Sequence, residues 1–239
     1  MLSKNQLKHI AKLSKKKYRH DKGLFIAEGE KVVRELLNSG WVAEEIYATN
    51  DQLEIPHTLV DISTINKISH LSTSSPIFAI FQIPKYDTPD FPPNGFSVAL
   101  DRIADPGNLG TIIRLCDWFG IKNLFCSPST VDCFNPKVVQ STMGSIARVQ
   151  CHYLDLGTLI DEFGTTVYAA TLDGVSHYKQ SFPSQGLLIM GSESHGVGDE
   201  LLQKIRNRIT IPTFSQGTGA ESLNVATATA ILLNEIFRP

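Results

Sequence analysis

The sequence contains no long hydrophobic run, and none of its apolar stretches approaches the roughly 20 residues that cross a bilayer as a helix. Cysteine is scarce as well: the four cysteines form no C-x-x-C pair and have no histidine at a zinc-ligand spacing. We therefore predict reduced, mostly buried thiols, no disulfide, no metal site and no membrane partner. The N-terminal segment lacks the apolar core of a secretory signal, so we predict a cytoplasmic protein. A mitochondrial presequence is the open alternative, although such segments favour arginine and serine over the lysine found here.

Charge is nearly balanced over the whole chain but not along it. The formal net charge is −2. Residues 1–22 contain eight Lys or Arg residues and one acid, Asp21, so this segment carries a net charge of +7 and the other 217 residues carry −9. The average therefore hides a strongly basic end.

Hydrophobic periodicity divides the chain into two α/β parts. Short helix and strand patterns alternate up to about residue 85, where a segment rich in proline and glycine follows. Beyond it, apolar strands at 96–100, 121–126, 165–171, 186–191 and 208–212 alternate with helices. This pattern predicts a mostly parallel, doubly wound sheet. We expect a small α/β domain at 1–87, a linker at 88–96 and a second domain at 97–239.

Three loops in the second part carry polar residues at positions where ligands of such sheets bind, beyond the carboxyl ends of the strands. In the first loop, Asn108 and Arg114 follow a strand and open a helix. A helix cap by Asn108 and a surface arginine is the alternative interpretation. In the third loop, Ser222 and Asn224 stand at the start of a largely apolar helix, where such residues are most often caps.

The second loop, "MGSESHG" at 190–196, has the outer glycines of a nucleotide-binding loop but Glu193 between them. A carboxylate there repels a pyrophosphate, and the sequence contains no G-K-[ST] motif, so both features argue against a nucleoside triphosphate and against the alternative of a nucleotide-dependent enzyme with a Rossmann-like sheet. A phosphate-free adenosine ligand, especially one with a positive sulfonium, meets no such objection. The alternative is a glycine-rich turn in which Glu193 caps the following helix.

Taken together, the motifs N-x-G-x-x-x-R at 108–114, G-x-E-x-x-G at 191–196 and S-L-N-V at 222–225 resemble those of the SpoU (TrmH-type) RNA ribose methyltransferases, a branch of the SPOUT superfamily. The resemblance covers 97–239. The N-terminal part, with "FIAEGEKVVRELL", is similar to the ribosomal-protein-like α/β substrate-binding domain that many members carry.

This resemblance implies a trefoil knot in the C-terminal part of the sheet and a homodimer whose active sites draw residues from both subunits. It implies S-adenosylmethionine as cofactor, held at Thr171, Gly191, Ile211 and Leu223, although the loop before Ser222 is somewhat longer than the common family pattern. The matching catalytic positions are Arg114, Asn108, Glu193, Ser222 and Asn224. Arg114 matches the residue to which the family assigns deprotonation of the ribose, but a guanidinium rarely gives up its proton and is better suited to holding a phosphate.

With RNA as the implied substrate, the basic N-terminal segment gains a role in binding phosphates. The residues predicted for it are Lys12, Lys15, Lys16, Lys17, Arg19 and Lys22, and Tyr18 could stack on a base. An exposed, solvated lysine face is the alternative. Ribosomal RNA is favoured over transfer RNA as substrate, and a catalytically silent RNA-binding or ribosome-assembly factor of the same fold is the competing function.

Overall fold

The computed structural model describes residues 2–51, 53–71, 73–86, 94–215 and 220–239. Its contacts separate the chain into two compact units. The first unit comprises Met1–Tyr86 together with Asp132–Arg148, and the second comprises Asp87–Val131 together with Val149–Pro239. Most of the predicted linker at 88–96 lies outside the described residues. Within the described ranges, no helix is long and apolar enough to span a bilayer.

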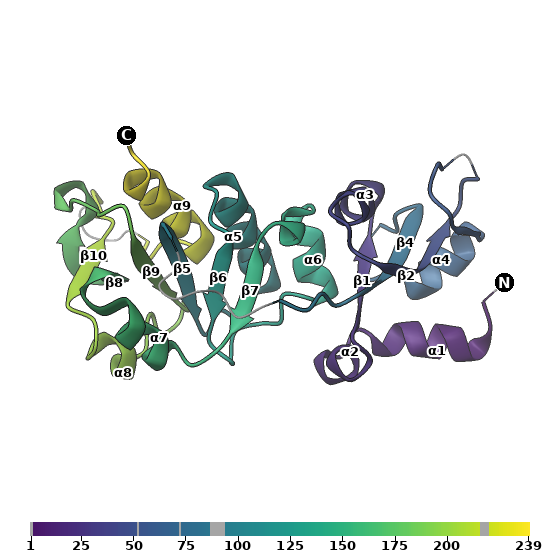
Figure 1. Ribbon diagram of the computed structural model, residues 1–239, viewed down its shortest axis with the longest axis horizontal. Helices are drawn as coiled ribbons and strands as arrows, with labels where there is room; N and C mark the ends of the chain where they lie inside the picture. The colour runs from purple at the N-terminus through teal and green to yellow at the C-terminus, as the bar shows by residue number, and fades with distance from the viewer. Residues whose placement is uncertain (1, 52, 72, 87–93, 216–219) are drawn as a thin grey trace. The chain divides into compact units, whose positions relative to one another are not determined.

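The N-terminal unit is built on a four-stranded sheet in the order β1-β4-β2-β3 (Figure 1). Strand β4 is antiparallel to β1 and β2, and the short β3 is parallel to β2. One buried cluster joins Ile10 and Leu13, at the end of α1, to Tyr47 and Phe78 of the sheet. The elements of this unit are α1 (Lys4–Lys12), α2 (Lys16–Lys22), β1 (Leu24–Glu28), α3 (Glu30–Asn38), β2 (Ala43–Ala48), β3 (Thr58–Leu59), α4 (Ile62–Ile68), β4 (Ile77–Gln82) and α6 (Pro136–Thr142).

A segment from the middle of the chain completes this unit. Helix α6 packs against β1, and its valines Val138 and Val139 are fully buried. The ring of Phe134, just before α6, lies 5.0 Å from the ring of Phe25. Residues 132–148 were predicted to belong to the second domain, because an amphipathic helix pattern shows that a face is buried but not which sheet buries it.

A buried ion pair ties the same segment to the basic N-terminus. The guanidinium of Arg19 binds the carboxylate of Asp132 through two hydrogen bonds, one of them 3.0 Å long, and also donates to the carbonyls of Leu13 and Ser14. The side chains of Arg19 and Asp132 are 1% and 3% exposed. Arg19 is therefore not available to RNA phosphates, and the role predicted for it from the basic run is wrong.

Replacement of Asp132 by asparagine is expected to lower the free energy of unfolding by about 3 kcal/mol, because it leaves the Arg19 charge buried without a counterion. Equilibrium unfolding in urea measures this loss. Glu35→Gln is the matched control, since it breaks the pair between Arg148 and Glu35, 2.7 Å apart and partly exposed, and such pairs contribute less than about 1 kcal/mol. Equal losses in the two variants would contradict a special role for the buried pair.

The C-terminal unit contains a six-stranded sheet in the order β10-β8-β9-β5-β6-β7 (Figure 1). All five pairings are parallel, which confirms the predicted parallel α/β sheet. Figure 1 shows α5 and α9 on one face of this sheet and α7 and α8 on the other. The elements are β5 (Phe96–Asp101), α5 (Pro106–Trp118), β6 (Asn123–Cys126), β7 (Gln150–Tyr153), α7 (Leu156–Phe163), β8 (Val167–Ser176), β9 (Gly186–Gly191), α8 (Asp199–Leu202), β10 (Asn207–Thr210) and α9 (Val225–Ile236).

The boundaries differ from the predicted ones at two places that matter for the site. Helix α5 begins at Pro106, two residues earlier than predicted, because Asp105 caps it. Strand β8 does not end at Thr171 but continues to Ser176. The short edge strand β7 was not predicted, since four residues that include Gln150 and His152 give little apolar alternation. All four cysteines are buried, as predicted.

Candidate active site

The first loop presents Asn108 from the N-terminal turn of α5. Asp105 is the N-cap residue, and its carboxylate accepts a hydrogen bond of 2.8 Å from the backbone N–H of Asn108. Pro106 occupies the first helical turn, where its missing N–H does no harm. The capping of α5 therefore does not use the Asn108 side chain, and the alternative interpretation of Asn108 as the helix cap is wrong.

The second loop is a tight turn at the end of β9. The N–H of Gly196 donates to the carbonyl of Ser192 over 2.8 Å, and Gly196 has a positive φ of 63°. A Cβ on Gly191 would lie 2.0 Å from the carbonyl carbon of Gly196, so only glycine fits there. Helix α8 has Gly198 at its N-cap and no side-chain cap. Glu193 therefore does not cap that helix and is presented at the tip of the turn.

The third loop presents Asn224 at the N-cap of α9. Its side-chain oxygen accepts hydrogen bonds from the N–H groups of Ala226 and Thr227, at 3.0 and 3.2 Å. Asn224 is thus a cap, as its position at a helix start predicted. Its side-chain nitrogen has a second partner, because it donates to the side-chain oxygen of Asn108 over 2.8 Å.

Asn108 links the other two loops. Its oxygen accepts from Asn224, and its nitrogen donates to the carboxylate of Glu193. These contacts join residues 85 and 116 positions apart in the chain. The resulting relay, Asn224 to Asn108 to Glu193, runs from the positive N-terminus of α9 to a carboxylate, so each hydrogen bond points its dipole toward the negative charge. These hydrogen bonds fix the orientation of the side-chain amides of Asn224 and Asn108, and Asn108 in turn holds the carboxylate of Glu193 in place.

Strand β5 also holds the turn that carries Glu193. The buried carboxylate of Asp101 accepts a hydrogen bond of 2.9 Å from the N–H of Gly198, and Arg102 lies within 3.4 Å of the carbonyl of Gly196. Arg102 has a positive φ of 59°, a conformation that a non-glycine residue rarely adopts. Neither residue was predicted from the sequence, although a charged pair that closes a buried strand just before a ligand loop is a signal that could have indicated them.

Arg114 and Ser222 are not part of the relay. Both residues are exposed, and no hydrogen bond or ion pair joins the side chain of either to another described residue. Arg114 lies on the exposed side of α5, one turn before Trp118, whose side chain is 84% exposed. Its guanidinium is therefore available to an anion or to another chain. Of the predicted catalytic residues, the structure brings three together and leaves these two apart.

Two of the predicted cofactor residues stand at strand ends, one precedes a helix and one lies within a strand. Gly191 ends β9, Ile211 follows β10, and Leu223 precedes α9 and is half exposed. Thr171 lies within β8. It falls in the part of the strand between Ala169 and Val175 that has no paired residue in β10. Its hydroxyl oxygen is buried and has no hydrogen-bond partner among the described residues. A buried polar atom of this kind needs a partner, so the site fits a ligand that carries hydrogen-bonding groups.

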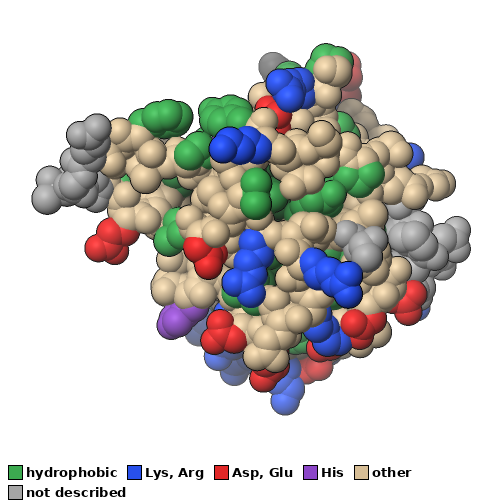
Figure 2. All heavy atoms as spheres, turned by 90° about the vertical axis from the view of Figure 1, so that its left-hand side faces the viewer, with side chains coloured by type: hydrophobic (Ala, Val, Ile, Leu, Met, Phe, Trp, Pro, Cys, Tyr) green, Lys and Arg blue, Asp and Glu red, His purple; other side chains and the backbone are tan. Residues whose placement is uncertain are grey.

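Exposed apolar side chains accompany these residues. Leu172, Val175 and Phe214 are more than half exposed. Figure 2, which faces the left-hand side of Figure 1, shows hydrophobic side chains at the surface of this end of the C-terminal unit, among Lys and Arg. Residues 216–219 of the loop before Ser222 lie outside the described residues. Among those described, no three His, Cys, Asp or Glu side chains are arranged to hold a metal ion.

Two family models match the two parts of the chain. The SpoU rRNA Methylase family model matches residues 95–234, and the MRM3-like substrate binding domain model matches residues 4–89. The 23S rRNA (guanosine(2553)-2'-O)-methyltransferase RlmP of Bacillus subtilis is 32% identical over 97% of this chain and 96% of its own length.

Solved structures with the same fold include an rRNA methyltransferase from Sinorhizobium meliloti with AdoMet bound. It has a TM-score of 0.86, is 30% identical and covers 100% of this chain and 96% of its own. A protein from Porphyromonas gingivalis described as an RNA methyltransferase of the TrmH family has a TM-score of 0.86 and is 37% identical, over 100% of this chain and 99% of its own. The chain therefore belongs to the SpoU rRNA methylase family, the S-adenosylmethionine-dependent RNA methyltransferases that its three motifs resemble.

Proposed function

We propose that this enzyme transfers a methyl group from S-adenosylmethionine to a ribose 2′-OH of ribosomal RNA, with a guanosine of the large-subunit RNA as the favoured target. The relay from Asn224 through Asn108 to Glu193 carries the proposal, because it assembles all three family motifs into one site. The Bacillus subtilis relative, named as a 23S rRNA guanosine 2′-O-methyltransferase, supports the choice of RNA and nucleotide. Transfer RNA is the second candidate substrate.

A ribose hydroxyl is a poor nucleophile, so it must be held in line and lose its proton as its oxygen takes the methyl group. S-adenosylmethionine supplies an electrophilic methyl group when bound. Arg114 holds an RNA phosphate through paired N–H donors and so positions the neighbouring ribose, and that phosphate can accept the proton. The Glu193 carboxylate, oriented by Asn108, and the Ser222 hydroxyl position the ribose and the guanidinium.

The cofactor site in this proposal comprises Thr171, Gly191, Ile211 and Leu223. The buried Thr171 hydroxyl without a described partner and the exposed Leu223 fit a ligand that combines hydrogen-bonding groups with an apolar base. The turn at 191–196 offers backbone groups at close range because Gly191 lacks a side chain. We also propose that this turn and the chain around it form the trefoil knot of the family.

A homodimer completes the proposed site. Arg114 has no contact with the relay, and it shares an exposed face of α5 with Trp118. Nearby, the partly exposed Phe237 at the end of α9 packs on Phe119 at the end of α5, with ring centroids 5.3 Å apart. An exposed tryptophan of this kind is typical of a protein interface. We infer that a second copy covers this face and that Arg114 of each copy serves the active site of the other.

The N-terminal unit is proposed to bind the RNA. Lys12, Lys15, Lys16, Lys17 and Lys22 are exposed and give an affinity that weakens with salt. The Tyr18 hydroxyl is hydrogen-bonded to His9 and its ring lies beneath Lys12 and Lys22, so the ring is less open to a base than the sequence indicated. A cytoplasmic location and the division of the sequence into 1–87 and 97–239 remain part of the proposal, with residues 132–148 of the second part folded into the N-terminal unit.

The proposal is tested by transfer of labelled methyl from S-adenosylmethionine to unmodified ribosomal and transfer RNA pools. Label in ribosomal RNA that appears in an alkali-resistant dinucleotide establishes ribose methylation, because a 2′-O-methyl group blocks cleavage of the next phosphodiester. Label confined to transfer RNA would mean that transfer RNA, not ribosomal RNA, is the substrate. Cofactor binding without transfer to either RNA, whether free or in ribosome precursors, would favour the catalytically silent factor.

Asn108→Asp is the sharpest variant for the relay. The substitution keeps the shape but turns a carboxylate oxygen toward Glu193, so we expect kcat to fall by about 100-fold without loss of folding. Adding Glu193→Gln returns a donor to this contact and should restore part of the lost rate. If the double variant remains as slow as the single one, the negative charge of Glu193, rather than its position, is what the reaction requires.

A further inference from the structure

The N-terminal unit contains a cavity of about 450 Å³ between α1, β2 and β3. Leu2 and Gln6 line it from just before α1 and from its first turn, Glu44, Glu45 and Tyr47 from β2, and Val60 from just after β3. All of these residues belong to the N-terminal unit, so the cavity is separate from the candidate active site. None of them belongs to the three motifs or to the charged residues of the basic segment 1–22.

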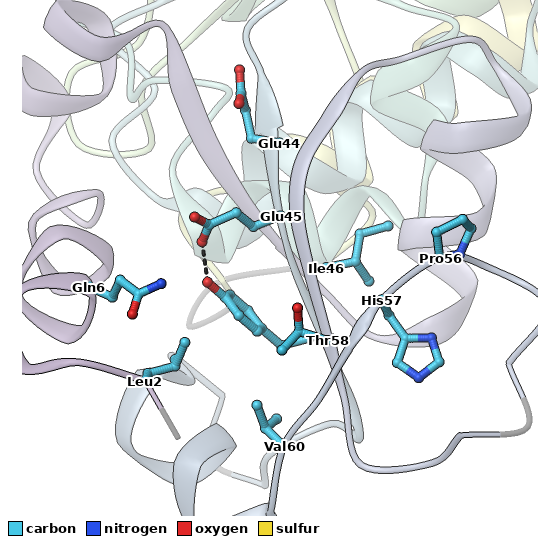
Figure 3. Close-up of a pocket in the computed structure, with 10 residues that line it drawn as sticks. Leu2, Gln6, Glu44, Glu45, Ile46, Pro56, His57, Thr58 and Val60 are labelled. Carbon is cyan, nitrogen blue, oxygen red and sulfur yellow. Dashed lines mark hydrogen bonds between the residues drawn. The ribbon is translucent and has the colours of Figure 1, made fainter.

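Glu45 provides hydrogen-bond acceptors in this cavity. Figure 3 shows its carboxylate directed toward Gln6. One oxygen accepts the hydrogen bond of the Tyr47 hydroxyl. Burial, with a further contribution from Glu45, raises the pKa of this hydroxyl above its ordinary value, so the hydroxyl keeps its proton and stays a donor. The remaining lone pairs of the carboxylate are open to a ligand that brings N–H donors.

Gln6 provides a donor on the opposite side. Its side-chain oxygen accepts from the backbone N–H and the hydroxyl of Ser3, both at 2.9 Å, and these bonds form the capping box of α1. The side-chain nitrogen is consequently left to face the cavity, toward Glu45 (Figure 3). No hydrogen bond joins Gln6 to Glu45 in the described structure, so a planar group that enters between them can bind both.

We propose that this cavity binds one unpaired guanine base of the substrate RNA, an inference that rests on the proposed function. Guanine is the base whose Watson–Crick edge places two adjacent N–H donors beside a carbonyl oxygen, matching the carboxylate of Glu45 and the amide N–H of Gln6. Leu2 and Val60 offer an apolar surface below the base. The exposed Lys4 and Lys8 on α1 hold the flanking phosphates.

Other ligands match the cavity less well. A protonated arginine or lysine side chain binds a carboxylate but offers no acceptor to the Gln6 amide. Adenine would turn its N1 acceptor toward Glu45 or leave Glu45 without a second donor. Cytosine has a single amino group for the carboxylate. Guanine uses both sides of the cavity.

The test compares the affinity of the full-length chain for four fluorescent oligouridines that carry a central guanosine, inosine, adenosine or cytidine. Inosine lacks only the 2-amino group of guanosine. We expect the guanosine oligonucleotide to bind about tenfold more tightly than the other three, since one lost bidentate contact changes affinity by this order. Equal affinity for guanosine and inosine, or a preference for adenosine or cytidine, overturns the proposal.

Two substitutions test the roles of the two side chains. Glu45→Gln should abolish the preference for guanosine while affinity for the oligouridine background is retained. Gln6→Glu should do the same and still fold, because glutamate also closes a capping box. The matched control is Glu44→Gln, on the same strand, which also lines the cavity but whose carboxylate is directed away from Glu45 and Gln6 (Figure 3) and accepts from Gln82 over 2.6 Å. A preference for guanosine that survives both cavity substitutions overturns the assignment.

Competition distinguishes RNA from a protein partner. Guanosine monophosphate should displace the guanosine oligonucleotide at lower concentration than arginine amide does, and the reverse order overturns the proposal in favour of a basic peptide. Methyl transfer measured on the same preparations separates the two hypotheses. Failure of transfer with an intact guanosine preference rejects only the proposed function, whereas transfer without that preference rejects only the guanine site.

Discussion

Replacement of Arg114 by alanine is expected to reduce kcat/KM for methyl transfer by roughly a thousandfold, because a fixed guanidinium that holds a phosphate contributes to the transition state about as much as a strong oxyanion donor. Arg114→Lys should retain part of the rate, since an ammonium keeps the charge but not the paired donors. Steady-state kinetics with unmodified ribosomal RNA measures both variants. The free energy of unfolding should hardly change, because Arg114 is exposed and has no partner among the described residues.

Arg206→Ala is the matched control for Arg114, as Arg206 is another exposed arginine of the C-terminal unit. It should change the rate less than about threefold, as expected for a solvated surface charge outside the active site. Similar losses in the two variants would mean that Arg114 contributes only general attraction of RNA. That result would remove Arg114 from the catalytic set.

Mixed dimers show whether Arg114 acts in the active site of its own chain or in that of the other copy. Each of the variants Arg114→Ala and Asn108→Asp should be nearly inactive alone. If Arg114 serves the site of the other copy, a mixed dimer contains one intact site, and an equimolar exchanged mixture recovers about one quarter of the wild-type activity. No recovery after subunit exchange would place Arg114 in the active site of its own chain.

The parallel sheet could be predicted from the sequence because its strands are short apolar runs separated by helix patterns, a signal that local periodicity carries. The start of α5 was also within reach, since an Asp-Pro pair before a helix pattern indicates a cap followed by proline at the first turn. Asp105 and Pro106 do occupy these positions. The helix was instead predicted to begin at Asn108, and the competing interpretation of Asn108 as a cap arose from that error.

The relay could not be predicted in the same way. Asn108, Glu193 and Asn224 were each singled out from their motifs, but the hydrogen bonds between them join positions 85 and 116 residues apart. Periodicity indicates which face of a helix or strand is buried and contains no information about such pairings. Only the order of strands β9 and β5 in the sheet brings the turn at Glu193 beside the start of α5.

Arg19 shows that a basic residue in a charged segment need not bind RNA. Within the run from Lys15 to Lys22, nothing local distinguishes it from its exposed neighbours. It is buried because Asp132, 113 residues away, provides a carboxylate for it. The same fact explains why residues 132–148 pack with the N-terminal unit, which a boundary drawn from linker composition could not reveal.

Gly191→Ala, which adds a single methyl group, is expected to lower both the stability of the protein and its methyl-transfer rate strongly. The new methyl group would lie 2.0 Å from the carbonyl carbon of Gly196 and 2.1 Å from the nitrogen of Val197. Both contacts are with backbone, so no side chain can move aside and the whole turn must shift. We expect the free energy of unfolding to fall by about 3 kcal/mol, and methyl transfer to fall by more than about 100-fold as Glu193 leaves Asn108.

Gly196→Ala separates this steric effect from the loss of a glycine as such. Gly196 has a φ of 63°, but no atom lies within 4 Å of its Cβ position. Alanine there should therefore cost only the strain of a left-handed conformation, about 1 kcal/mol, and leave the turn in place. Calorimetric titration with S-adenosylmethionine and urea unfolding of both variants compare the two effects. If Gly191→Ala binds the cofactor and unfolds like Gly196→Ala, the close approach of the turn to β9 is not what holds the cofactor site, and Gly191 would lose its place among the cofactor-binding residues.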